Sequence, residues 1–280
     1  MRLVTVEYEG APRVGVRTGS EGVILTEYGD MKDLIKDGEA GLARVRAALD
    51  SNEPHQGLKL LAPITEPGKI LCSGINYAAH SEEDAHAKLP VEPSVFSKLP
   101  SSIIGPDEAI VIPTLDCQTD YEVELAFIIG KKAKNVSKAD ALDYIFGYTV
   151  MNDVSERARQ FQLQHETIGK GVDTFCPIGP EIVLPDEVAD PSQLRVRSYV
   201  NGELRQDAHT SQQIFSIPAM IEYLTSMFTL NPGDIVSTGT PAGCGAFMNP
   251  PQFLQPGDHV VVEVEGVGRL SNPVAAGWKA

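Results

Sequence analysis

Three carboxylates stand at the ends of two neighbouring apolar runs, in a pattern that suits a metal site. Glu122 and Glu124 open the run that ends at Ile129, and Asp153 follows the run 145–152. Alternate side chains of a strand share a face, so both glutamates would point the same way. Like charges on a partly buried face repel each other and lose solvation. A cation between the carboxylates would relieve both costs.

The face opposite the glutamates is apolar and consists of Tyr121, Val123, Leu125, Phe127 and Ile129. The glutamate face also turns apolar, at Ala126 and Ile128, which is unlike a solvated face that stays polar to its end. A solvated Glu-x-Glu face is nevertheless the alternative that this motif alone leaves open. Because the three acids come without His or Cys, the donor set favours Mg²⁺ or Mn²⁺ first, Ca²⁺ next and zinc last.

His80 and Glu83 lie three residues apart in a segment, 76–83, that reads as a short helix or a mobile loop. At this spacing they would share one helix face, where a carboxylate orients an imidazole and raises its basicity. That is what a general base needs in order to take a proton from water. A solvated helix face is the simpler reading of the spacing by itself.

Two glycine-rich segments could present polar groups. Residues 169–174 lack the length of a P-loop and its Ser/Thr after the lysine, so they indicate a tight turn that presents Lys170. Residues 238–245 expose consecutive backbone N–H groups that could hold a carboxylate or an oxyanion. No G-x-S-x-G motif occurs, which disfavours serine hydrolysis.

Composition narrows the class of protein. The 280 residues carry a net charge of −15, which would repel nucleic acid and anionic membranes. The N-terminus shows no signal peptide and no stretch reaches a membrane-spanning length, so we expect a cytoplasmic protein. The four cysteines are scattered without a C-x-x-C pair, which predicts small buried residues rather than a zinc cluster or disulfides.

The chain is predicted to have two parts, a small N-terminal α/β domain over residues 1–62 and a catalytic domain over 63–280. Turn formers at 50–57 mark the end of the first part. Its expected strands are 3–8, 12–17 and 22–25, followed by helical segments 31–36 and 42–49. The second part is mostly strands, expected at 69–72, 95–98, 109–112, 122–129, 145–151, 181–184, 194–200, 234–238 and 259–264. Helices are expected at 155–163 and 218–228, and Asn201-Gly202 predicts a hairpin turn, so the fold class is α+β.

Taken in order along the chain, these motifs resemble the fumarylacetoacetate hydrolase family. The matching residues are Asn76-Tyr77 with His80 and Glu83, Phe96-x-Lys98, the run 121–125, Asn152-Asp153-Val154-Ser155 with Arg157 and Gln160, the run 169–174, and Thr238-Gly239-Thr240-Pro241-Ala242-Gly243. The resemblance extends from about residue 63 to residue 280. It implies a mixed β-sheet roll or barrel with flanking helices.

The resemblance also implies roles for these residues. Glu122, Glu124 and Asp153 would hold the metal, His80 and Glu83 would activate water, and Lys170 would be catalytic. The residues implied to bind substrate are Tyr77, Lys98, Arg157, Gln160 and Thr240. Two positions depart from the family pattern, because Ala158 stands where an aspartate is usual and Cys244 where an aliphatic residue is usual.

The activity that follows from the resemblance is metal-dependent hydrolysis of a carbon–carbon bond in a β-diketone, such as a 2,4-dioxo acid of the acylpyruvate kind. A decarboxylase of the oxaloacetate type, or an isomerase, could use the same site. A third hypothesis is a binding protein that kept the fold without the chemistry. We expect a homodimer, since many short strands have edges that need covering.

Overall fold

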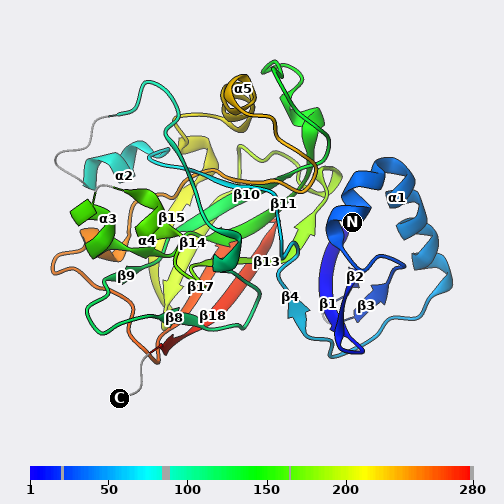
Figure 1. Cartoon of the computed structure of the whole chain (residues 1–280), viewed down its shortest axis with the longest axis horizontal. Coiled ribbons are helices and arrows are strands. Elements are labelled where there is room, and N and C mark those ends of the chain that lie inside the picture. Colours follow the sequence, from blue (N-terminus) through cyan, green and yellow to red (C-terminus); the bar gives the residue numbers. More distant parts are fainter. Residues whose placement is uncertain (20–21, 84–88, 164, 278–280) are drawn as a thin grey trace.

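The computed structural model describes residues 1–19, 22–83, 89–163 and 165–277 of the chain (Figure 1). Within these residues most strands belong to two sheets, and few helices flank them, which confirms the α+β class. The larger sheet has the order β3-β2-β1-β13-β11-β10-β16-β5-β6, with β4 added beside β1 and β7 beside β13. Its strands are β1 (Arg2–Tyr8), β2 (Ala11–Thr18), β3 (Gly22–Leu25), β4 (Leu60–Leu61), β5 (Ile70–Ser73), β6 (Val95–Ser97), β7 (Ile103–Ile104), β10 (Val123–Ile129), β11 (Ile145–Asn152), β13 (Cys176–Val183) and β16 (Ile235–Ser237).

The second sheet has the order β15-β14-β17-β18-β8, and a two-stranded ribbon pairs β12 with β9. These strands are β8 (Ile110–Ile112), β9 (Thr119–Asp120), β12 (Ser155–Glu156), β14 (Arg195–Val200), β15 (Glu203–His209), β17 (His259–Val264) and β18 (Gly268–Ala276). Asn201 and Gly202 both have positive φ between β14 and β15, as the predicted two-residue hairpin turn requires.

The helices lie outside the sheets and are short, apart from the first (Figure 1). They are α1 (Met31–Ser51), α2 (Ala78–Glu83), α3 (Arg157–Leu163), α4 (Glu166–Lys170) and α5 (Ile217–Met227), with 3₁₀ turns η1 (Pro100–Ser102), η2 (Ala141–Tyr144), η3 (Pro185–Glu187), η4 (Thr210–Gln212) and η5 (Gly245–Phe247). Gly38 breaks α1 with φ 55°, between the two helical segments that were predicted.

Strand β10 separates two hydrophobic cores. The predicted apolar face, residues 121, 123, 125, 127 and 129, packs into the core that β14, β17 and α5 share. Ala126 and Ile128, on the glutamate face, pack into the other core with Cys72, Met151 and Cys176. All residues of β10 are therefore buried, which confirms the alternation and excludes a solvated glutamate face.

The N-terminal strands extend the main sheet rather than forming a separate one. β1 pairs antiparallel with β13, at Arg2 opposite Val183 and Leu3 opposite Ile182. The Arg2 guanidinium also donates to Glu181 of β13 over 2.5 Å. The second core likewise includes residues of β1, α1 and β10. The division at residue 62 stays a prediction, and the two predicted parts share a sheet and a core.

Some local expectations were wrong. Residues 155–163 are not one helix, because Ser155 and Glu156 pair with β9 before α3 begins at Arg157. Lys170 ends the helix α4 instead of lying in a tight turn. The strand β18 was missed, since polar Asn272 occupies one of its buried positions and Pro273 lies within it.

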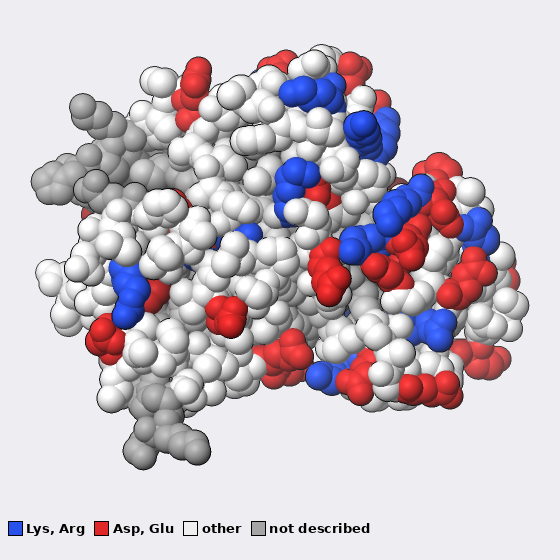
Figure 2. Space-filling model, in the orientation of Figure 1, with Lys and Arg blue, Asp and Glu red and all other residues white. Residues whose placement is uncertain are grey.

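On the face shown in Figure 2, basic side chains lie next to acidic ones around the N-terminal elements, and much of the remaining surface is uncharged. No extended basic area is visible among the described residues on this face. No described helix has the length and apolar character to cross a membrane. The expected lack of nucleic-acid partners, the homodimer and the cytoplasmic location stay predictions.

Candidate active site

Strand register brings the three predicted metal ligands together. In the antiparallel pair β10–β11, Val123 lies opposite Asn152, so Glu122 and Asp153 continue from adjacent strand ends. The Asp153 N–H donates to the Glu122 carbonyl over 2.9 Å, and the Asn152 side chain accepts from the Glu122 N–H. One oxygen from each of Glu122, Glu124 and Asp153 lies within 4.8 Å of the others, and all three residues are buried.

Two of these carboxylates have cationic partners. The Lys170 ammonium donates to Glu122 over 2.7 Å and to Asp153 over 3.0 Å. Arg157 donates to the other Glu122 oxygen, and Lys98 donates to the other Asp153 oxygen. Buried carboxylates need such partners, because desolvation otherwise favours the neutral acid.

Glu124 differs, because none of the ion pairs found among the described residues includes it. Among the residues that the structure describes, its carboxylate accepts from the Ser237 hydroxyl and, over 3.0 Å, from the Gly239 N–H. Burial, followed by the charges of Asp153 and Glu122, holds the pKa of Glu124 well above its usual range. Of the three acids, Glu124 is the one that forms no ion pair with any residue that the structure describes, although the charge of Lys170 acts on it from nearby.

The neighbouring groups titrate in the opposite sense. Burial alone would raise the pKa of Glu122, but the charges of Lys170 and Arg157 outweigh it and lower that pKa to about 2. Burial would lower the pKa of Lys170, yet Asp153 and Glu122 raise it above its usual value. Lys170 is therefore a fixed cation at neutral pH.

A hard divalent cation fits these residues. The donor set is three carboxylates with converging oxygens, as Mg²⁺ and Mn²⁺ prefer. A cation there would also give Glu124 a direct cationic partner. Lys98, Lys170 and Arg157 could then interact with a bound anion as well as with the carboxylates.

The predicted general base His80 and its partner Glu83 lie on α2 and are partly exposed. His80 Nδ1 lies 2.9 Å from one Glu83 oxygen, and the other Glu83 oxygen accepts from the Gly243 N–H over 2.8 Å. The two side chains are 12% and 20% exposed, in contrast to the fully buried acids. The ring of Phe247 meets His80 edge-on, with centroids 5.5 Å apart.

The turn after β16 holds α2 against the acidic cluster. Buried Asn76 donates to the carbonyls of Thr238 and Phe215, and its side-chain oxygen accepts from the Phe215 N–H. Gly239 has φ 88°, and a Cβ there would come within 2.8 Å of the Asn76 Cβ. The glycine is thus needed both for its conformation and for the close approach.

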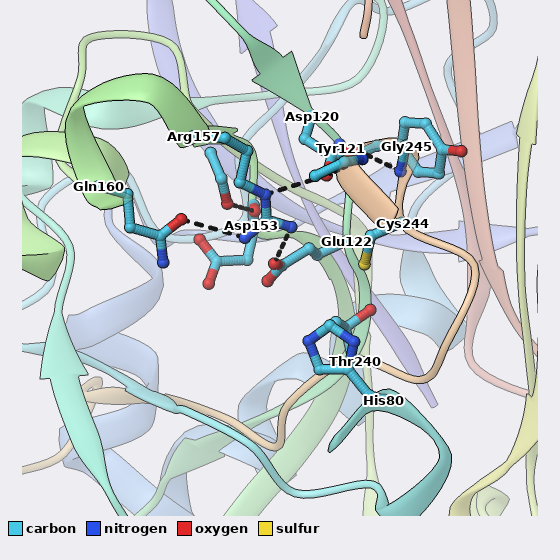
Figure 3. A network of polar contacts seen from close by, with 12 residues as sticks. His80, Asp120, Tyr121, Glu122, Asp153, Arg157, Gln160, Thr240, Cys244 and Gly245 are labelled. Atoms are coloured by element: carbon cyan, nitrogen blue, oxygen red, sulfur yellow. Dashed lines mark hydrogen bonds and ion pairs between the residues drawn. The ribbon is translucent and has the colours of Figure 1, made fainter. Parts of the chain in front are cut away.

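One cavity of about 280 Å³ contains most of the predicted site (Figure 3). Its lining includes His80, Glu122, Glu124, Arg157, Gln160, Lys170 and Thr240, together with the aromatic rings of Phe96, Phe161 and Phe247. In Figure 3, Arg157 and Gln160 lie on one side of the opening and His80 and Thr240 on the other. Asp153 lies directly behind this lining, bonded to Lys170.

Two predicted substrate contacts do not reach this lining. Tyr77 is buried and accepts from Gln213, and Lys98 is 1% exposed and bound to Asp153 and the Val154 carbonyl. Their predicted substrate roles stay predictions. The contacts that the structure shows join them to other residues of the protein. Thr240 donates to the Val123 carbonyl, which ties its turn to the start of β10.

Sequence reasoning missed the residue that orients Arg157. Asp120 is fully buried, accepts from Arg157 over 2.9 Å, and accepts from the N–H groups of Gly245 and Ala246. Its position two residues before Glu122 was the only available signal. Gln206 was also missed: it bridges Val123, Thr240 and Pro241 from β15, far away in sequence, where nothing in the local pattern marks it.

Comparison with known proteins identifies the family. The family described as fumarylacetoacetate (FAA) hydrolase C-terminal matches residues 69–275. The chain belongs to the fumarylacetoacetate hydrolase family. It is 43% identical over 288 residues to oxaloacetate tautomerase fahd2, mitochondrial, of Xenopus laevis, covering 98% of this chain and 90% of that protein. It is 40% identical over 277 residues to human oxaloacetate tautomerase FAHD2A, mitochondrial, covering 94% and 87%.

Solved structures of the family share the whole fold. A fumarylacetoacetate hydrolase from Exiguobacterium antarcticum superposes with a TM-score of 0.88 at 35% identity, covering 99% of both chains. Maleylpyruvate hydrolase from Sphingobium sp. SYK-6, in complex with manganese(II) and pyruvate, gives 0.85 at 30% identity, covering 99% of this chain and all of that one. The predicted family fold is confirmed, and metal binding is consistent with the manganese in that relative.

Proposed function

We propose that this protein is a Mg²⁺- or Mn²⁺-dependent enzyme that interconverts the keto and enol forms of oxaloacetate or a similar 2-oxo dicarboxylic acid. The observation that supports this best is that His80, which is hydrogen-bonded to Glu83, lines the same cavity as Glu122 and Glu124 of the acidic cluster. The similarity over nearly the whole chain to proteins named oxaloacetate tautomerase favours this substrate.

The metal would be held by Glu122, Glu124 and Asp153. When bound, Mg²⁺ or Mn²⁺ would act as a Lewis acid that polarises the 2-oxo group and so acidifies the adjacent carbon. Lys170, held cationic by Glu122 and Asp153, adds a fixed positive charge where negative charge develops on the substrate oxygen.

His80 performs the proton transfer in this proposal. It takes a proton from the carbon beside the oxo group, the electrons of that C–H bond form the enol double bond, and the oxo oxygen takes a proton from solvent while His80 gives up the proton it accepted. The reverse order returns the keto form. Glu83, fixed by the Gly243 N–H, orients the His80 ring for both directions. Gln160 and Arg157 offer N–H donors for the distal carboxylate.

Hydrolysis of a carbon–carbon bond in an acylpyruvate-like 2,4-dioxo acid is the second candidate. The same His80–Glu83 pair could take a proton from water, and a maleylpyruvate hydrolase is among the structural relatives. Decarboxylation of oxaloacetate is a variant of the first proposal in which loss of CO₂ replaces proton removal. The positions of Lys170 and Arg157 suit all three reactions. Assays with several substrates are therefore needed to decide which reaction the enzyme catalyses.

The test is to follow the ultraviolet absorbance of enol-oxaloacetate with Mg²⁺ or Mn²⁺, and to assay acylpyruvates and maleylpyruvate in parallel. We expect metal-dependent enol–keto conversion that stops with EDTA and returns with added metal. His259→Ala, an exposed histidine on β17, is the matched control and should keep full activity. Rapid acylpyruvate hydrolysis without tautomerisation would replace the first proposal by the second.

A further inference from the structure

Cys244 lies beside the His80–Glu83 pair. One donor atom from each of His80, Glu83 and Cys244 lies within 4.8 Å of the others. The group includes none of the three carboxylates already described. Its donors are imidazole, carboxylate and sulfur, a softer set than the acidic cluster offers.

The backbone fixes the sulfur in this position. Gly243 has φ 106°, and a Cβ at that residue would come within 2.2 Å of the Arg205 carbonyl oxygen. The same residue donates its N–H to Glu83, so one tight turn positions both Glu83 and the cysteine that follows it. Cys244 is fully buried, with its sulfur 3.7 Å from Gln206 Nε2, and Figure 3 shows the sulfur turned toward the His80 side of the site.

We propose that His80, Glu83 and Cys244 form a second metal site, for a zinc-class cation, whose occupation switches the enzyme off. Zinc binds Cys, His and carboxylate at about 2.0–2.3 Å in tetrahedral geometry, which places its donor atoms roughly 3–4 Å apart. The donors here need only small side-chain adjustments to reach that spacing. Binding breaks the Cys244 S–H bond, forms a zinc–sulfur bond and releases the proton to solvent.

The fourth coordination position would face the cavity, because His80 lines it. Zinc on His80 or Glu83 removes the imidazole from proton transfer while Mg²⁺ can remain on the acidic cluster. Two metals of different hardness would thus have opposite effects at one cavity. The inhibitory part of this proposal rests on the proposed role of His80, whereas the binding part does not.

The binding test uses the Mg²⁺-saturated protein titrated with Co²⁺, a spectroscopic substitute for zinc. We expect the near-ultraviolet thiolate-to-cobalt charge-transfer band in the wild type, and its loss when Zn²⁺ competes. Cys244→Val, which replaces the thiol by an apolar side chain of similar size, should lack the band. Cys117→Val, at a buried cysteine near Thr114 and Arg159, is the matched control and should keep it. Mn²⁺ calorimetry on each variant confirms that the fold and the acidic site persist.

The functional test measures zinc inhibition of whichever metal-dependent reaction the substrate panel identifies. Cys244→Val should keep the Mg²⁺-dependent rate, and its zinc concentration for half-inhibition should rise by more than about tenfold, because removing a ligand should cost at least as much as losing an outer-sphere partner. A charge-transfer band that survives in Cys244→Val, or is absent from wild type, would overturn the site. A band without zinc inhibition would overturn the switch alone, and neither result depends on which substrate is turned over.

Discussion

Glu122 and Glu124 of the acidic cluster line one cavity together with His80 of the His80–Glu83 pair, but the cluster and the pair are built in different ways. The cluster stands at adjacent ends of β10 and β11, is fully buried, and is cross-linked by Lys98, Lys170 and Arg157. The His80–Glu83 pair lies on a six-residue helix and is partly exposed. Glu83 is hydrogen-bonded to the Gly243 N–H, which fixes the pair to the rest of the protein.

The difference separates two tasks. Charged groups that hold a metal and stabilise developing charge work best when they are preorganised and kept from water. A proton-transfer group must instead exchange protons with substrate and solvent, which requires access. In the proposed reaction the sheet would therefore supply fixed charge, and the short helix would supply a proton acceptor that solvent can reach.

The largest expected effect comes from substituting Glu124, the residue of the acidic cluster that forms no described ion pair. Glu124→Gln keeps the side-chain shape and can accept from Ser237 and Gly239, but it removes one of three anionic ligands. Mn²⁺ affinity and activity should both fall more than about 100-fold, beyond the usual cost of losing an outer-sphere partner. Calorimetry and rate measurements check this.

Glu124→Gln is a clean test because no described cation loses its partner. Breaking a buried ion pair costs about 3–5 kcal/mol, whereas removing a buried charge that lacks one relieves a desolvation cost. The metal-free variant should therefore melt no lower than wild type. Glu265→Gln, at an exposed glutamate, is the control. Unchanged Mn²⁺ affinity in Glu124→Gln would place the metal elsewhere.

A smaller effect is expected from removing the base. His80→Ala should slow tautomerisation or hydrolysis by roughly 100- to 10,000-fold, the range that general-base help supplies. Mn²⁺ affinity should be unchanged, because no described hydrogen bond joins His80 to the three acids. Metal-dependent decarboxylation of oxaloacetate needs no proton acceptor and should fall much less. An equal fall in all reactions, with metal affinity intact, would remove His80 from proton transfer.

Period-2 alternation in 121–129 predicted that Glu122 and Glu124 share a face, whereas Asp153 joins them through the pairing of β10 with β11. The two faces do pack into different cores. The family motifs also identified His80, Glu83, Lys170 and Arg157, all of which the structure brings to one place. The roles of these residues stay proposals, since proximity alone does not show chemistry.

Partners that come from distant strands could not be predicted. Ser237 reaches Glu124 only because β16 pairs with β10, and Gln206 reaches Thr240 across 34 residues of sequence. The pairing of β5 with β6 brings Lys98 to Asp153, a contact that the sequence did not predict, and its substrate role stays a prediction. Such contacts depend on strand order, which a single sequence with short strands does not specify.

The smallest expected effect concerns proton release when the metal binds. Glu122 and Glu124 share a face, yet the pKa of Glu122 is lowered to about 2 and that of Glu124 is raised. At the pH where Glu124 is protonated, Mn²⁺ must displace one proton rather than two. Affinity should then fall about tenfold for each unit by which the pH lies below the Glu124 pKa.

The same shifts predict how the metal-free protein responds to pH. Because the folded pKa of Glu124 is raised, its contribution to stability is full below the unfolded value of about 4.3 and is lost as the pH rises through the folded pKa. Glu122 acts oppositely, and its contribution disappears as the pH falls from about 4.3 toward about 2. Added Mn²⁺ should therefore raise the melting temperature more at higher pH.

Calorimetry in two buffers of different ionisation enthalpy counts the protons released when Mn²⁺ binds, and Glu124→Gln should release none. Release of two protons, or an affinity independent of pH, would show that both glutamates titrate alike and that the contrast within the cluster is wrong.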